Sequence, residues 1–151
     1  MRTEKPVTWS SVVVLCGCLA CLILPGCRRR ADLPPVAKVS GVVTLDGKPL
    51  PRGTIQFVPD ASKGTEGATA VGTIDSEGHY RLKTAGVDGA IVGFHKVGVY
   101  ALKQEPADET APPPPPLIPP KYFNPETSGL RAEVKAGQEN ELDFPLRSRP
   151  Q

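Results

Sequence analysis

The chain has 151 residues and a formal net charge of +2 at pH 7, which suits one domain and provides no strong field for nucleic acid. Its 18 prolines and 15 glycines are too many helix breakers for a helical bundle, and aromatic residues make up only 5%. The composition therefore argues against a large enzyme, a helical protein and a nucleic-acid binder.

The N-terminal residues have the pattern of an export signal. Arg2 and Lys5 supply positive charge, and an uncharged apolar stretch follows from residue 12 to residue 24. This stretch is too short to cross a bilayer comfortably and fits the apolar region of a signal peptide. We therefore expect residues 1–26 to be a signal peptide. The alternatives are an ordinary secreted protein and a single membrane anchor.

The sequence Leu24-Pro25-Gly26-Cys27 follows at once and resembles the lipobox of bacterial lipoproteins. The resemblance implies that Cys27 carries diacylglycerol and attaches the exported chain to membrane lipid of the bacterial cell envelope. No cysteine follows Cys27 in the sequence, so the mature chain would have no internal disulfide. A metal site made by the cysteines is disfavoured, because they lie in an apolar segment without histidine. Residues 27–37 are expected to be the lipidated cysteine and a flexible tether.

From Val39 onward, apolar and polar residues alternate in short runs separated by turn signals, and no window shows sustained helical periodicity. Seven strands are expected, with these residues on their inner faces: Val39, Gly41, Val43 and Leu45; Ile55 and Phe57; Ala70, Gly72 and Ile74; Tyr80 and Leu82; His95, Val97, Val99 and Ala101; Leu130, Ala132 and Val134; Leu142, Phe144 and Leu146. The pattern predicts an all-β antiparallel sandwich over residues 38–147, with residues 148–151 as a tail.

The segment Asp75-Ser76-Glu77-Gly78 has the composition of a tight hairpin turn. Gly78 should adopt a positive φ there, because glycine has no Cβ to oppose it. A calcium loop is the alternative. It would need more carboxylates at fixed spacing, so the turn is favoured.

Residues 104–120 interrupt the alternation with acidic residues, five successive prolines at 112–116 and two more at 119–120. Proline has no N–H to donate, so we expect no strand here and an extended polyproline conformation instead. We interpret this Pro-rich loop as a tolerated insertion that contributes nothing to the core. A ligand for an aromatic groove on a partner is the alternative.

Three segments resemble carboxypeptidase-regulatory-like, transthyretin-like β-sandwich domains of small bacterial surface lipoproteins. They are residues 39–50, with Leu45-Asp46-Gly47-Lys48-Pro49; residues 72–82, with Asp75-Ser76-Glu77-Gly78-His79-Tyr80; and residues 118–130, with Tyr122-Phe123-Asn124-Pro125. The resemblance implies a seven-stranded Greek-key sandwich. It also implies a non-catalytic structural or interaction role.

The sequence shows no catalytic constellation. Two histidines are present, His79 and His95, and we interpret both as ordinary strand residues. There is no nucleophile elbow, phosphate loop or zinc-protease motif. One transthyretin-like branch hydrolyses 5-hydroxyisourate and ends in Tyr-Arg-Gly-Ser, whereas this chain ends Arg147-Ser148-Arg149-Pro150-Gln151. We therefore predict that the protein is not an enzyme and needs no cofactor or metal.

The leading functional hypothesis is a lipid-anchored envelope protein with a structural or interaction role. The alternative is a module that binds a peptide or a carbohydrate at the membrane surface, with an envelope protein or an envelope glycan as its partner. In that case Tyr100, Tyr122 and Phe123 are the residues expected to contact the ligand, because aromatic side chains dominate such surfaces.

Overall fold

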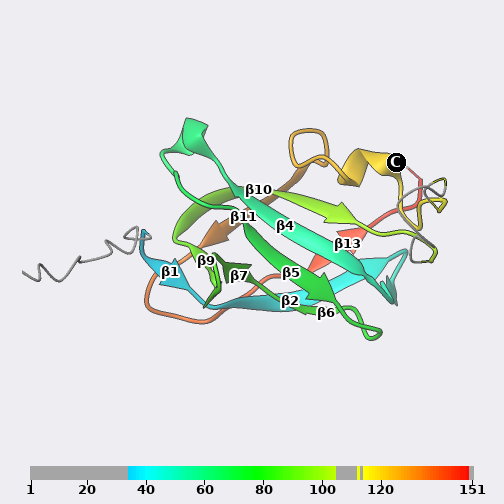
Figure 1. The fold of residues 1–151 in the computed structure, drawn as a ribbon, viewed down its shortest axis with the longest axis horizontal. Helices are drawn as coiled ribbons and strands as arrows, with labels where there is room; N and C mark the ends of the chain where they lie inside the picture. The colour runs from blue at the N-terminus through cyan, green and yellow to red at the C-terminus, as the bar shows by residue number, and fades with distance from the viewer. Residues whose placement is uncertain (1–33, 105–111, 113, 150–151) are drawn as a thin grey trace, which may run out of the picture.

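The computed structural model describes residues 34–104, 112 and 114–149, so the predicted signal peptide (residues 1–26) and Cys27 lie outside the described residues. The described part is all-β, as predicted, and its sheet is strongly curled (Figure 1). Its strands are β1 Val36–Ala37, β2 Val39–Leu45, β3 Lys48–Pro49, β4 Gly53–Pro59, β5 Ala70–Ile74, β6 His79–Arg81, β7 Lys83–Thr84, β8 Val87–Asp88, β9 Ala90–Ile91, β10 Gly93–Tyr100, β11 Leu130–Val134, β12 Asn140–Glu141 and β13 Phe144–Leu146. Two short 3-10 helices accompany them, η1 Ala61–Lys63 and η2 Pro120–Tyr122.

The main sheet has the strand order β11-β10-β4-β5-β6-β2-β12, and β13 also pairs with β2. Neighbouring strands are antiparallel from β11 to β2, but β12 and β13 run parallel to β2. The sequence pattern predicted antiparallel strands throughout. Parallel pairing needs a long connection, and strands from opposite ends of the domain have one.

The core follows the predicted alternation. Val43, Ile55, Phe57, Val97 and Val99 have no exposed surface. Three aromatic rings meet at its centre, with centroids 5.7–6.4 Å apart: Phe57, Tyr80 and Phe144. Such tilted and edge-on arrangements add to the free energy gained from burial alone. Three of the chain's eight aromatic residues therefore stabilise the centre of the domain.

The seventh predicted strand is broken at Leu142 and Asp143, between β12 and β13, and the prediction was wrong at that point. The Asp143 carboxylate accepts the N–H of Val42 at 2.8 Å, so a side chain replaces the ladder bond that the break removes. The backbone carbonyl of Leu142 instead accepts the hydroxyl of Tyr80 at 2.6 Å. This close approach of the Leu142 backbone to β2 is possible because residue 41 is a glycine. A Cβ at Gly41 would overlap the Leu142 carbonyl group.

Residues 36 and 37 were expected to be the end of a flexible tether, but they form β1. Val36 pairs with Ile91 and Ala37 with Ala90, and the Ala37 side chain is buried. The ordered domain therefore begins before Val39, because a two-residue strand there completes a small second sheet with β9.

The end of the Pro-rich loop belongs to the core, which corrects the expectation that residues 104–120 contribute nothing to it. Leu102 forms a β-bridge with Pro116, and the N–H of Lys103 donates to the Pro115 carbonyl at 3.0 Å. Ile118 is 2% exposed and joins the core cluster. Proline lacks a donor but keeps its carbonyl, so a proline segment can accept from a neighbouring strand. Residues 105–111 and 113 lie outside the described residues.

We expect Gly41→Ala to lower the free energy of unfolding by about 2 kcal/mol or more, because the added methyl group forces Leu142 away from β2. Tyr80→Phe should cost about 1–3 kcal/mol, because it leaves the Leu142 carbonyl without its donor. Chemical denaturation monitored by circular dichroism measures both. Ser40→Ala, on the outer face of the same strand, is the control and should change stability little. Full stability of Gly41→Ala would contradict this account of the close approach.

Candidate functional site

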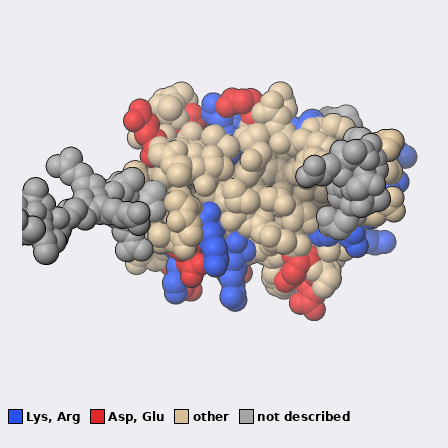
Figure 2. Space-filling view, viewed as in Figure 1, with Lys and Arg blue, Asp and Glu red and all other residues tan. Residues whose placement is uncertain are grey.

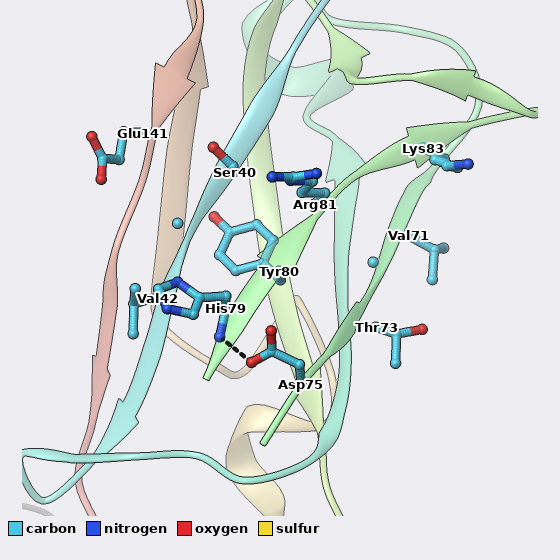
Figure 3. A pocket seen from close by; sticks show the side chains of 12 residues that line it. Ser40, Val42, Val71, Thr73, Asp75, His79, Tyr80, Arg81, Lys83 and Glu141 are labelled. Carbon is cyan, nitrogen blue, oxygen red and sulfur yellow. Dashed lines mark hydrogen bonds between the residues drawn. The ribbon is translucent and has the colours of Figure 1, made fainter. Parts of the chain in front are cut away.

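A groove of about 820 Å³ lies on the outer face of the sheet, where β2, β5 and β6 come together (Figure 3). The polar positions of the alternating strands provide its lining, since the residues between them face the core. Apolar Val42 and Val71, the hydroxyls of Ser40 and Thr73, and the ionisable residues Asp75, His79, Arg81, Lys83 and Glu141 line it. Tyr80 is the single aromatic residue among the lining residues, and it is only 2% exposed.

The hairpin turn at one end of the groove is confirmed. The Asp75 carboxylate accepts the N–H groups of Glu77 and His79, both at 2.9 Å, and Gly78 has a φ of +83°. These bonds occupy the carboxylate in holding the turn (Figure 3). Across the described residues, no group of three or more His, Cys, Asp or Glu side chains is placed to hold a metal ion. Asp75 is therefore a structural residue of the turn.

The positive charges around the groove differ in their pairing. Lys83 lies 3.5 Å from the carboxylate of Asp88, and Lys38 lies 2.9 Å from that of Glu139 in an adjoining hollow of about 480 Å³. The hydrogen bond between Lys38 and Glu139 raises the pKa of the lysine and lowers that of the glutamate. Within the described ranges, no carboxylate lies within ion-pair distance of Arg81.

Arg81 and Lys83 both line the two hollows, but Lys83 has Asp88 within ion-pair distance. Among the described residues, the Arg81 guanidinium is therefore the cation without a carboxylate partner that this surface offers to a ligand. Figure 2 shows Lys and Arg side chains gathered along the lower border of the view, close to the position of β7 in Figure 1. The middle of this face carries few charges.

The three aromatic residues predicted to contact a ligand do not lie together. Tyr100 is 45% exposed, and its ring centroid is 4.6 Å from that of Phe123. Tyr122 is 5% exposed, and its hydroxyl accepts the N–H of Arg147 at 3.1 Å. The turn of η2 directs the Tyr122 ring inward, so this residue offers little surface to a ligand. Tyr100 and Phe123 form a surface pair that does not line the groove.

The sequence pattern gave no reason to single out Arg81 or Ser40. Both occupy outward positions of alternating strands, and that is also where ordinary solvated residues lie. What brings them together is the pairing of β2 with β6, in which Ser40 stands opposite Arg81. The sequence could have indicated them only through a predicted strand pairing that places two polar residues opposite each other.

His95 is a core residue. It is 1% exposed, its ring centroid is 5.8 Å from that of Phe57, and Nδ1 is 3.2 Å from the carbonyl oxygen of Gly93. Nε2 has no hydrogen-bond partner among the described residues. Burial lowers the pKa of His95, because the charged imidazolium would lose its hydration. His79, in contrast, is exposed at the hairpin turn.

Comparisons of the chain with family models, with curated proteins and with solved structures found no match. None of the helical turns in the described ranges is long or apolar enough to cross a membrane.

The buried neutral His95 should make stability depend on pH. Its pKa is lower in the folded protein than its unfolded value of about 6.5. The contribution of neutral His95 to stability is therefore complete above the unfolded-state pKa. It is lost as the pH falls below that unfolded-state pKa. Between pH 7.5 and 5.5 we expect the free energy of unfolding to fall, by no more than about 1.4 kcal/mol for this one group.

Denaturant titrations at the two pH values test this expectation. The loss should persist in His79→Gln and shrink in His95→Gln. An unchanged pH dependence in His95→Gln would mean that another group causes it.

Proposed function

We propose that the protein is a lipid-anchored, non-catalytic protein of the bacterial cell envelope whose β-domain is an interaction module. The observation that carries the proposal is Leu24-Pro25-Gly26-Cys27 directly after an uncharged apolar stretch. Diacylglycerol on Cys27 would supply two acyl chains, which is what stable membrane attachment needs. The eight residues 28–35 could span at most about 30 Å, so the domain would stay near the membrane surface.

For the domain itself we propose a transthyretin-like Greek-key sandwich with seven principal strands. The seven predicted segments overlap β2, β4, β5, β6, β10, β11 and β13, although Leu82, Ala101 and Leu142 lie outside these strands. The buried, alternating inner faces of these strands support a single core between curled layers. Other carriers of such domains act as structural or interaction modules, which fits the absence of a catalytic motif in the sequence.

The groove favours a binding role over a purely structural one. Arg81 is exposed where the groove meets the adjoining hollow, and a guanidinium binds a carboxylate through two parallel hydrogen bonds. Neutral sugars usually need an exposed aromatic ring to stack on, and Tyr80 is buried. The apolar surfaces of Val42 and Val71 beside the Ser40 and Thr73 hydroxyls suit a short peptide with an acidic side chain. We therefore favour an acidic peptide segment of an envelope protein as the ligand.

The proposed anchor and the far end of the domain lie apart. β1 is at one end of the molecule, and the turn between β5 and β6 is toward the opposite end (Figure 1). Attachment before β1 would leave the opposite end of the groove, at the Asp75 turn, away from the anchor. A partner could then reach the groove from the side that faces away from the membrane.

Lipidation of Cys27 is directly testable. Mass spectrometry of the N-terminal peptide from membrane-purified protein should show a mature chain that begins at Cys27 and carries acyl chains. Cys27→Ser should abolish both the processing and the membrane fraction, whereas Cys21→Ser should leave them unchanged. An unmodified N-terminus elsewhere in the chain would overturn the anchoring proposal.

Binding in the groove is tested with an array of short peptides that differ in their acidic residues. We expect Arg81→Ala to weaken binding of acidic peptides about tenfold, which corresponds to one charge-assisted interaction of about 1.4 kcal/mol. Arg81→Lys should recover only part of the affinity, because an ammonium group lacks the planar fork. Arg52→Ala removes an exposed arginine outside the groove and is the matched control. Equal binding by all three variants would exclude the groove as the site.

A further inference from the structure

β11 forms one edge of the main sheet. It is the first strand in the order, and β10 is its one strand neighbour among the described elements. Arg131 and Glu133 of β11 are exposed, whereas Ala132 and Val134 face the core. An edge strand with free backbone groups is a template for pairing with another strand. Whether a second strand can pair with β11 depends on which backbone groups β11 presents and on whether its side chains repel that strand.

The register of β10 and β11 shows which backbone groups face outward. Phe94 of β10 directs its backbone away from β11, since its N–H donates to Thr65 Oγ1 at 2.8 Å and its carbonyl accepts from Asp60 at 2.9 Å. Glu133 stands opposite Phe94, so its own N–H and C=O point away from β10. The alternation of an antiparallel ladder directs those of Arg131 outward as well.

Of the outward-facing backbone groups of this edge, those at one end have hydrogen-bond partners and those in the middle have none among the described residues. The backbone N–H and C=O of Lys135, next in the row, are bonded by the side chain of Asn140 at 2.9 and 3.1 Å. In the part of the chain that the structure describes, nothing bonds the backbone N–H and C=O of Arg131 and Glu133. The edge therefore offers two donors and two acceptors, spaced two residues apart.

The side chains of this edge are complementary to a second copy of themselves. If two β11 strands pair antiparallel about a twofold axis at Ala132, Arg131 stands opposite Glu133 of the second copy, and Glu133 opposite its Arg131. The pairing forms four backbone hydrogen bonds and two cross-strand pairs of opposite charge, which favour such contacts. An axis at Arg131 or at Glu133 would place like charges opposite each other. The charges thus select one register.

The competing interpretation is that charged side chains protect this edge from association, as they do in many sheets. Protection is most effective when a strand carries one sign of charge, since two copies then repel. Here the two outward residues carry opposite signs at positions i and i+2. Within the described ranges, neither has an ion-pair partner, and the Arg131 guanidinium bonds only the carbonyls of Leu130 and Pro125.

We propose that β11 joins two copies of this chain edge to edge, as an antiparallel twofold dimer centred on Ala132. The two sheets then continue across the interface, and each copy contributes the same surface. This inference does not depend on lipidation of Cys27 or on a ligand in the groove, and it holds for any location of the chain.

The test is sedimentation equilibrium of the full-length protein in detergent, with the density contribution of the detergent matched by the solvent. The native protein should show a concentration-dependent dimer. Arg131→Glu and Glu133→Arg should each raise the dissociation constant at least tenfold. The double variant, with both charges reversed, restores opposite charges across the axis and should return to within about threefold of native, since surface pairs differ modestly in strength. Arg52→Glu is the control for a change of charge elsewhere.

Hydrogen exchange gives a second measurement at single-residue level. The N–H groups of Arg131 and Glu133 should exchange quickly in dilute protein and slowly in concentrated protein. The N–H of Ala132, which faces β10, should be protected in both. A monomer at all concentrations, a dimer insensitive to the single reversals, or a double variant as weak as the single variants would each overturn the proposal.

Discussion

The domain is organised around one close approach, between the backbone of Leu142 and the space that Gly41 leaves empty. Because no Cβ stands there, the C-terminal segment can bulge toward β2 at Leu142 and resume pairing along the same edge of β2 as β13. The Leu142 carbonyl is directed toward Gly41 at this point, and the Tyr80 hydroxyl donates to it. A buried carbonyl without a donor would cost more than the hydrogen bond itself provides. The glycine, the break in the strand and the tyrosine hydroxyl therefore have to occur together.

The same contact connects the core with the groove. Tyr80 packs inward against Phe57 and Phe144, and this fixes the position of β6 beside β2. Its neighbour Arg81 must then point outward, because successive side chains of a strand alternate between faces. The guanidinium is held over the groove by the packing of the residue before it. A binding site placed on a strand in this way needs no loop to order when a ligand arrives.

Alternation was enough to predict most of the core, because it follows from strand geometry alone. It placed Phe57, Tyr80 and Phe144 in the interior before any pairing was known. Alternation failed at Leu142, because it assumes a continuous ladder of hydrogen bonds. It also failed at Ile118, because the neighbouring prolines, which lack N–H donors, suggested that this segment lies outside the core. It could not locate the groove, because Ser40 and Arg81 become neighbours only through the pairing of β2 with β6, some forty residues apart. The partner of the Tyr80 hydroxyl is a backbone carbonyl, which has no signature in a sequence.

The two edges of the sheet differ in how fully their backbone groups are hydrogen-bonded. The two surfaces proposed for interaction therefore lie in different parts of the sheet. At the β2 end, β12, β13 and β3 cover the strand, and Asp143 fills the remaining gap in the ladder. At the β11 end, Asn140 closes one position, and the next two remain open. The groove is lined from β2, β5, β6, β7 and β12, with no residue from β10 or β11. Pairing through β11 would therefore leave the groove of each copy accessible. Two grooves related by a twofold axis would bind a partner that carries two acidic segments more tightly than either groove alone.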